Sequence, residues 1–361
     1  MNDRRASALR VGVGALADYP DRIDVRSPAE FALDHVPRAV NHPVLDDTER
    51  ARVGTLYVTS EFAARKLGAA LVARNISRML ETAFADKPRD WRPLVYCWRG
   101  GQRSRSLAHV LNEIGWRAMQ LDGGYRAYRR HVVAQLAVLP ARYDFVVICG
   151  LTGSGKSRLL DALATAGAQT LDLEGLARHR GSLLGDLPGA PQPSQKCFES
   201  LLHTLLEGLD PARPVFVESE SRRVGTLQLP DALLSRMHQG RGLTLLMPLA
   251  QRVALLKEQY AHFIADPEHL RERLQPLTPL HGKATLARWA ALAAASDWDA
   301  LVGELLDRHY DPTYARSLGR NFPAALRSSS VEVHDASRAG FVTLAREVLA
   351  SIDERGTVTA S

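Results

Sequence analysis

The clearest structural signal in the chain is Tyr143-Asp-Phe-Val-Val-Ile-Cys149, followed without a break by Gly150-Leu-Thr-Gly-Ser-Gly-Lys156-Ser157. The first run is apolar and β-branched, as strands buried in a parallel sheet are. The second fits the pattern G-x-x-x-x-G-K-[ST] without a mismatch and leads into a helical run at 158–166. A strand, a glycine-rich loop and a helix in this order are what a phosphate-binding P-loop requires.

The expected ligand contacts of this loop follow from its chemistry. Glycines let the backbone wrap around a phosphate, exposed N–H groups and the helix N-terminus supply positive potential, Lys156 neutralises charge, and Ser157 is suited to hold Mg²⁺. A carboxylate at the end of a later strand usually helps to hold the metal, and Glu218 and then Asp172 are the candidates, although either also fits a helix cap. We expect the loop to grip a diphosphate or triphosphate through Gly150, Thr152, Gly153, Ser154, Gly155, Lys156 and Ser157.

Apolar runs that alternate with helical stretches predict an α/β fold with mostly parallel sheets. The strand candidates are 22–25, 93–96 and 117–121 in the first half, and 143–149, 169–173, 214–217, 243–247 and 331–333 in the second. Residues 252–306 are predicted to be helical, with an interruption at 276–279. A chain of 361 residues exceeds what one core usually fills, and Leu139-Pro140 breaks the pattern, so we expect two domains, 1–138 and 139–361.

The composition, 45% hydrophobic and 24% charged, is that of a globular protein, and no apolar run reaches the ~18 to 20 residues that span a bilayer. The start of the chain lacks the features of a secretory signal, so we expect a cytoplasmic protein without a membrane partner. A net charge of +6 and a pI near 9.4 favour a polyanionic partner, although a basic enzyme without one has the same values. Three scattered cysteines predict neither disulfides nor a zinc site.

A second loop, Val95-Tyr-Cys97-Trp-Arg99-Gly-Gly-Gln-Arg103-Ser104, places a cysteine after an apolar strand and an arginine six positions later. Ser104 is expected to start a helix that runs to about Ile114. Loop N–H groups, Arg103 and the helix N-terminus then converge on the sulfur and favour its thiolate. Cys97 is therefore the predicted nucleophile, whereas Cys149 and Cys197 fit ordinary packing positions better.

The first half resembles the rhodanese sulfurtransferases in this loop, in Asp24-Val-Arg-Ser-Pro-Ala-Glu30-Phe31 and in Leu121-Asp-Gly-Gly124-Tyr125. It departs from them in one respect. The common sulfurtransferase loop has its arginine five positions after the cysteine, whereas six is the spacing of phosphatase-type loops. The wider cradle suits a phosphate-sized or selenium-bearing group, and a phosphatase remains an alternative for the loop alone.

A cysteine loop and a P-loop in this order resemble the bacterial tRNA 2-selenouridine synthases. The resemblance is weakest after about Gly240. Before that point it extends beyond the two loops to Val53-Gly-Thr-Leu-Tyr57, Ala64-Arg-Lys-Leu-Gly68, Leu171-Asp-Leu-Glu-Gly-Leu-Ala-Arg-His-Arg-Gly-Ser182, Gln192-Pro-Ser-Gln-Lys196 and Glu218-Ser-Glu-Ser-Arg222.

That resemblance implies a rhodanese-like domain followed by a P-loop domain with a helical C-terminal part. It implies a transferase that alkylates the sulfur of wobble 2-thiouridine in tRNA with geranyl diphosphate and then replaces the S-geranyl group with selenium from selenophosphate. Lys156, the loop amides and Mg²⁺ would neutralise the leaving diphosphate. Cys97, Arg99 and Arg103 would handle the selenium donor, either by carrying selenium covalently or by positioning selenophosphate.

The matching blocks add further candidates, each of which fits a salt bridge or a cap as well: Asp172, Glu174, His179, Arg180 and Arg222. For tRNA backbone contacts the candidates are Arg129, Arg130, Arg180, Arg222 and Arg223, with a solvated surface as the alternative for each. No tightly bound cofactor is expected beyond Mg²⁺. The rival function is a sulfurtransferase or phosphatase coupled to a nucleotide-hydrolysing P-loop domain.

Overall fold

The computed structural model describes residues 9–322 and 329–358. The chain folds as two compact units, one comprising Met1–Gln135 with Pro193–Thr204 and the other comprising Leu136–Gln192 with Leu205–Ser361. The change of unit after Gln135 lies three residues before the boundary expected from the sequence. The segment Pro193–Thr204 differs from that expectation, because it packs with the first unit although it follows the P-loop in sequence.

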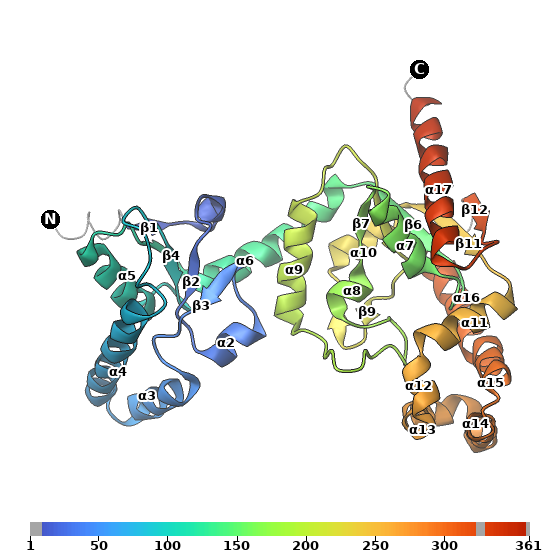
Figure 1. The fold of residues 1–361 in the computed structure, drawn as a ribbon, viewed down its shortest axis with the longest axis horizontal. Helices are drawn as coiled ribbons and strands as arrows, with labels where there is room; N and C mark the ends of the chain where they lie inside the picture. Colours follow the sequence, from blue (N-terminus) through green and yellow to red (C-terminus); the bar gives the residue numbers. More distant parts are fainter. Residues whose placement is uncertain (1–8, 323–328, 359–361) are drawn as a thin grey trace. The chain divides into compact units, whose positions relative to one another are not determined.

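The first unit is built on a parallel sheet of five strands in the order β1-β5-β4-β2-β3. Three of the strands confirm the sequence prediction, while β1 and β3 are too short to give a periodic signal. In Figure 1 the helices of this unit flank the sheet. The elements are β1 Arg10–Val11, η1 Val13–Asp18, β2 Arg22–Asp24, α2 Pro28–Leu33, β3 Ala39–Asn41, α3 Asp47–Thr59, α4 Glu61–Glu81, β4 Leu94–Tyr96, α5 Gln102–Ile114, β5 Met119–Leu121 and α6 Gly124–Leu136.

Central strand β4 carries the cysteine loop at its carboxyl end. All three residues of β4 are buried, and the core around it is apolar and aromatic, with Phe84 and Trp91 among its largest members. Helix α5 begins at Gln102, two residues earlier than expected, with Gly101 as its N-cap. The loop between β4 and α5 is therefore only five residues long, which brings Cys97 close to the start of the helix.

The second unit contains another parallel sheet of five strands, in the order β12-β11-β6-β8-β7. The predicted strands are confirmed, with ends shifted by at most two residues. Strand β7 stops at Leu171 because Asp172 begins a helix. The strands are β6 Phe145–Cys149, β7 Gln169–Leu171, β8 Val215–Glu218, β11 Arg241–Leu246 and β12 Ser329–Glu332, and a small antiparallel pair is formed by β9 Arg223–Val224 and β10 Leu227–Gln228.

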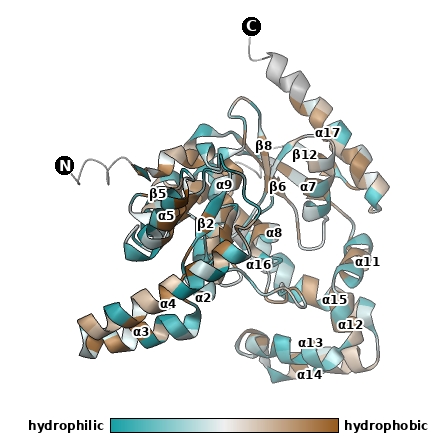
Figure 2. Cartoon of the chain, turned by 60° about the vertical axis from the view of Figure 1, so that its left-hand side comes forward, coloured by the Kyte–Doolittle hydropathy of each residue, from teal (hydrophilic) through white to brown (hydrophobic). Residues whose placement is uncertain are grey.

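Helices cover the second sheet. Several of the later helices pack together in a separate apolar cluster around Trp289. The helices of this unit are η2 Leu139–Arg142, α7 Lys156–Thr165, α8 Leu173–Ala177, α10 Asp231–His238, α11 Leu249–Gln259, α12 Ala261–Ala265, α13 Pro267–Leu274, η3 Gln275–Leu277, α14 Thr278–Ala294, α15 Trp298–Leu305, η4 Leu306–Tyr310, α16 Asp311–Asn321 and α17 Arg338–Val358. Helix α9 Gln195–Glu207 belongs to the first unit up to Thr204. Figure 2 shows α3 beside α4 in the first unit, and α13 beside α14 in the second. Within the described ranges, no helix is both long and apolar enough to span a bilayer.

Candidate functional site

The P-loop connects the central strand β6 to helix α7. Gly150, Gly153 and Gly155 all have positive φ, the conformation that a side chain disfavours. A Cβ atom on Gly155 would also lie 2.3 Å from Cζ of Phe341, a core residue of α17. The glycines are therefore required both by backbone conformation and by close packing, as the sequence pattern predicts.

Lys156 is the first residue of α7, and its ammonium lies inside the loop. Nζ donates a hydrogen bond to the carbonyl of Gly150 at 3.0 Å and lies 5.1 Å from the centre of the Tyr314 ring. Burial lowers the pKa of Lys156, but Tyr314 and three nearby glutamates raise it more, so the pKa lies above its ordinary value. The side chain is thus charged and directed at the position of a loop-bound anion.

Three glutamates face this lysine: Glu174, Glu218 and Glu220. One carboxylate oxygen from each lies within 4.8 Å of those of the other two. Burial, and then repulsion from neighbouring carboxylates, raise the pKa of Glu220 to about 8, while burial raises that of Glu218 to about 7 despite Lys156 and a hydrogen bond from Ser157. The pKa of Glu174 is also well above its ordinary value, first through burial. Such a group can bind a proton or a cation at neutral pH.

Glu218 lies where the metal-binding acid of a P-loop protein is expected, at the end of the strand next to β6. Its Oε1 is buried and has no hydrogen-bond partner among the described residues. Glu220 was not predicted from the sequence, although it lies in the quoted block only two residues after Glu218. Asp172, the second metal candidate, caps α8 by accepting a hydrogen bond from the Gly175 amide at 2.7 Å. This is the helix-cap role that the sequence offered as the alternative.

These residues line a cavity of about 610 Å³. His179 and Arg180 also belong to it. His179 is held by Asp186, and the Arg180 guanidinium bonds the Gln259 carbonyl and lies 4.9 Å from the centre of the Tyr260 ring. Arg180 thus lines the cavity at the P-loop. The sequence alone could not distinguish this position from a salt bridge or a helix cap elsewhere.

An apolar pocket adjoins this cavity. Five residues line both spaces, among them Thr152 of the P-loop and the rings of Tyr260 and Tyr310. The other walls are hydrophobic and come mostly from helices α12, α13 and α15: Phe263, Ile264, Leu270, Trp298, Leu301, Val302 and Leu305. The pocket holds about 70 Å³, so it takes only the end of a long hydrocarbon chain. An apolar pocket thus lies beside the cavity that the P-loop and the acidic group line.

Residues from the C-terminal helices support the P-loop, although no motif in the sequence pointed to them. Buried Arg252 donates to the Thr152 carbonyl at 2.8 Å and forms a two-point ion pair with Asp311. The Tyr314 hydroxyl accepts a hydrogen bond from the Gly150 amide at 3.0 Å and contacts Ser219. Arg252 and Tyr314 lie after Gly240, where the family resemblance is weakest. The helical pattern around them does not distinguish them from ordinary helix residues.

In the first unit, Cys97 lies at the bottom of the β4–α5 loop. Its sulfur accepts hydrogen bonds from the Gly101 amide at 3.3 Å and from the Ser104 hydroxyl at 3.2 Å. The carbonyls of Cys97 and Trp98 accept hydrogen bonds from the start of α6, and a Cβ on Gly124 would lie 2.3 Å from the Cys97 carbonyl oxygen. The structure thus gives the loop the anion-binding geometry expected from its sequence.

The two arginines of the loop differ in their surroundings. Arg103 forms an ion pair with Glu30, with NH1 2.8 Å from Oε2. Arg99 is exposed at the rim. Near the rim, the ammonium of Lys196 lies 5.8 Å from the centre of the Trp98 ring. Lys196 belongs to Pro193–Thr204, so this segment adds a cation near the cysteine loop that the predicted domain boundary did not anticipate.

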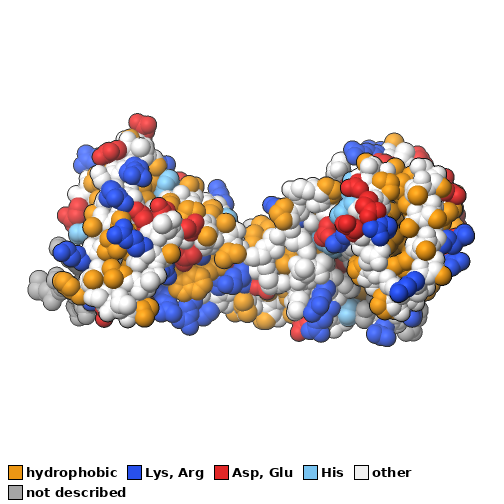
Figure 3. Space-filling view, turned by 90° about the horizontal axis from the view of Figure 1, so that it is seen from below, with side chains coloured by type: hydrophobic (Ala, Val, Ile, Leu, Met, Phe, Trp, Pro, Cys, Tyr) orange, Lys and Arg blue, Asp and Glu red, His pale blue; other side chains and the backbone are white. Residues whose placement is uncertain are grey.

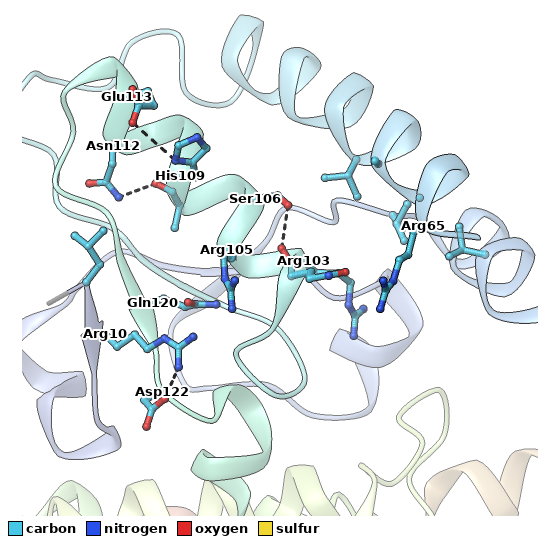
Figure 4. Close-up of a pocket in the computed structure, with 18 of the residues that line it drawn as sticks. Arg10, Arg65, Arg103, Arg105, Ser106, His109, Asn112, Glu113, Gln120 and Asp122 are labelled. Carbon is cyan, nitrogen blue, oxygen red and sulfur yellow. Dashed lines mark hydrogen bonds and ion pairs between the residues drawn. The ribbon is translucent and has the colours of Figure 1, made fainter. Parts of the chain in front are cut away.

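A groove of about 1250 Å³ runs along the other side of α5. Figure 4 shows Arg10, Arg65, Arg103 and Arg105 around it. Most of this positive charge is already paired, Arg10 with Asp122 and Arg65 with Glu61. The groove is accordingly a weak candidate for an anion site.

Of the five arginines predicted to contact tRNA, Arg180 lines the P-loop cavity, and the other four differ in their exposure. Arg129 is bound to Glu199, Ser200 and the Lys196 carbonyl, and its side chain is only 12% exposed. Arg130, Arg222 and Arg223 are exposed, with Arg222 paired to Asp231. On the face shown in Figure 3, lysine and arginine side chains are scattered among acidic ones rather than gathered in one patch.

Comparison with known proteins matches both units. A family model described as a rhodanese-like domain matches residues 14–131, and one described as the tRNA 2-selenouridine synthase AAA domain matches residues 143–278. The chain is 36% identical over 269 residues to a tRNA 2-selenouridine synthase of Nitrosomonas europaea, covering 73% of this chain and 69% of the relative. It is 32% identical to those of Aeromonas salmonicida (84% and 88% covered) and Sulfurovum sp. (83% and 89%). Among solved structures, an N-terminal domain from Clostridium difficile 630 is 32% identical over 34% of this chain and 97% of its own, with a TM-score of 0.31.

Proposed function

The chain belongs to the tRNA 2-selenouridine synthase family, and we propose that it makes 2-selenouridine from wobble 2-thiouridine in two steps, with geranyl diphosphate and then selenophosphate as co-substrates. In the first step, the uridine sulfur attacks C1 of the geranyl group, the C1–O bond breaks, and diphosphate leaves with the bonding electrons. In the second, selenium attacks C2, the C2–S bond breaks and geranylthiol leaves, while water releases phosphate from selenium.

The observation that carries this proposal is the apolar pocket next to the P-loop cavity. A nucleotide offers a polar sugar and a flat base beyond its phosphates, whereas a prenyl diphosphate offers a hydrocarbon chain. The walls contributed by Phe263, Val302 and Leu305 suit a hydrocarbon, and they begin at Thr152, next to the loop amides. The end of the geranyl chain would occupy this pocket, and the rest would lie in the adjoining cavity.

The residues of the P-loop would then stabilise the leaving diphosphate. The amides at the start of α7 and the Lys156 ammonium neutralise the charge that develops as the C1–O bond breaks. Lys156 bonds the Gly150 carbonyl in the structure, so it would exchange this contact for a phosphate oxygen. Arg180 lines the same cavity and supplies a second cation, held in place by the Gln259 carbonyl and the Tyr260 ring.

The acidic group fits a divalent cation. Three carboxylates converge within 4.8 Å, and the buried Oε1 of Glu218 lacks a partner among the described residues. Glu218, Glu220 and the hydroxyl of Ser157 would hold the ion, and Glu174 would complete the oxygen ligands that Mg²⁺ prefers. The ion would supply further charge neutralisation for the diphosphate.

The cysteine loop would serve the second step. Its amides, the start of α5 and the exposed Arg99 favour an anion at the Cys97 sulfur, which fits selenophosphate or selenium bound to the sulfur. Arg103 forms an ion pair with Glu30, and in this proposal the pair holds the loop in its conformation. In this proposal, the two units handle the two successive anionic co-substrates.

The test separates the two steps by nucleoside mass spectrometry on thiolated tRNA. With geranyl diphosphate alone, wild type should form S-geranyl-2-thiouridine and Lys156→Ala should not. With both co-substrates, Cys97→Ala should accumulate that intermediate without 2-selenouridine, while the control Cys197→Ala behaves as wild type. Consumption of ATP with unmodified tRNA would instead favour the nucleotide-hydrolysing rival.

A further inference from the structure

A polar side chain lies buried behind the cysteine loop, where the sequence predicts only an apolar strand. Gln120 is the middle residue of β5 and is 5% exposed. Its amide nitrogen lies 2.8 Å from the Gly100 carbonyl, 3.1 Å from the Gly101 carbonyl and 2.6 Å from the Ser104 hydroxyl. Two of these partners are carbonyls and accept only, so the atom that faces them must be the NH₂ group.

This orientation determines what Ser104 can do. An amide nitrogen does not accept hydrogen bonds, so the Ser104 oxygen accepts from Gln120 and keeps its own hydrogen for another partner. Two acceptors are within reach of that hydrogen, the Cys97 sulfur at 3.2 Å and the Gly101 carbonyl at 3.3 Å. The Gly101 carbonyl already accepts the Arg105 amide at 3.1 Å and also faces the Gln120 NH₂ group, so the sulfur is the acceptor left to the hydroxyl.

We propose that Ser104 and Gln120 are positioning residues for Cys97, with Gln120 orienting the Ser104 hydroxyl so that it donates to the sulfur. The inference rests on the proposed role of Cys97 as the reactive thiol. Together with the Gly101 amide, the hydroxyl gives the sulfur two donors, an arrangement that stabilises a thiolate and leaves the thiol proton without an acceptor. Ser104 is fully buried, so water cannot replace the hydroxyl.

The charged groups near the loop stay the same in the variants that test this proposal. They are the ion pairs Arg103–Glu30 and Arg26–Asp24, together with Arg99 and Lys196. Ser104→Ala removes the hydroxyl, and Gln120→Met keeps the length of the side chain but removes the donor. Ser106→Ala is the matched control, because Ser106 lies on the same helix and its hydroxyl bonds the Gln102 carbonyl.

The experiment is a titration of the full chain by the ultraviolet absorbance of the thiolate, with each protein compared against its Cys97→Ala counterpart so that only Cys97 contributes. Loss of a hydrogen bond to a charged group should move the midpoint upward by about one pH unit or more in Ser104→Ala. Gln120→Met should give a smaller upward shift in the wild-type background and none in the Ser104→Ala background, because Gln120 acts through the hydroxyl. Ser106→Ala should titrate as wild type.

The outcomes separate this inference from the proposed function. A wild-type midpoint like that of a free thiol would count against Cys97 as the nucleophile itself. A wild-type midpoint well below it, unchanged in Ser104→Ala, would overturn the inference and leave the proposed function standing. An equal shift from Gln120→Met with and without Ser104 would show that Gln120 acts on the loop by another route. If Gln120→Met fails to fold, Ser104→Ala decides the matter alone.

Discussion

Replacing Glu220 by glutamine should stabilise the protein at alkaline pH. A carboxyl whose pKa is raised by folding holds a proton that the unfolded chain has already released. Its ionisation therefore opposes folding increasingly as the pH rises from the ordinary value of 4.5 through the folded value of about 8. At about 1.4 kcal/mol per unit of pKa, a few kcal/mol of stability are lost across this range. Glu220→Gln removes the charge and keeps the shape, so most of the loss should disappear.

The assay is urea denaturation at pH 5 and pH 9 with wild type, Glu220→Gln and the control Glu272→Gln, which changes an exposed residue of α13. The free energy of unfolding of Glu220→Gln minus that of wild type should be larger at pH 9 than at pH 5 by about 2 kcal/mol or more. Mg²⁺ should stabilise wild type at pH 9 more than it stabilises the variant, because the ion replaces the proton. If the difference in free energy of unfolding between Glu220→Gln and wild type is the same at both pH values, the raised pKa of Glu220 is refuted.

Three further results are expected. Gly155→Ala should destabilise the second unit and abolish binding of inorganic diphosphate in calorimetry, whereas Gly167→Ala, with positive φ but nothing within 4 Å of the added carbon, should cost only about 1 to 2 kcal/mol and leave binding intact. Asp34→Ala should lower the free energy of unfolding by about 2 to 4 kcal/mol in thermal denaturation, because the Tyr125 hydroxyl and other buried donors lose their acceptor; a smaller change would contradict this. Val302→Trp should raise KM for geranyl diphosphate about tenfold by filling the apolar pocket, without weakening the binding of inorganic diphosphate. Equal weakening of both ligands would count against the pocket as the site of the geranyl chain.

The sequence predicted the two loops well because each is continuous. Strand, glycines, charged residue and helix follow one another at 143–166 and again at 94–114, so local geometry alone places their amides. The same holds for the strands that feed them. The short strands β1 and β3, two and three residues long, carry no periodicity, and only pairing with β5 and β2 defines them.

The supporting residues could not be predicted, because their partners are distant in sequence. Arg252 reaches the P-loop from about 100 positions away, and the helical pattern around it gives no sign of this contact. Segment Pro193–Thr204 was assigned to the wrong unit for the same reason. Its attachment to the first unit depends on Ser200 donating to Asp34, 166 positions earlier, and on Arg129. Gln120 offered a weak local signal, as a polar residue in a strand predicted to be buried.

The two units share one arrangement, a loop that connects a central strand to the start of a helix, and in our proposal each loop holds an anion. In the P-loop, Lys156 would neutralise the charge of the leaving group, and Tyr314 together with three nearby glutamates raises the pKa of this lysine. In the cysteine loop, the Cys97 sulfur accepts hydrogen bonds from two neutral donors, the Gly101 amide and the Ser104 hydroxyl. A leaving diphosphate gains negative charge, which a cation neutralises. A nucleophilic sulfur loses its charge as it reacts, so its hydrogen-bond donors must not hold it too strongly. The choice of Lys156 in one loop and Ser104 in the other therefore follows from the opposite directions in which charge moves in the two proposed steps.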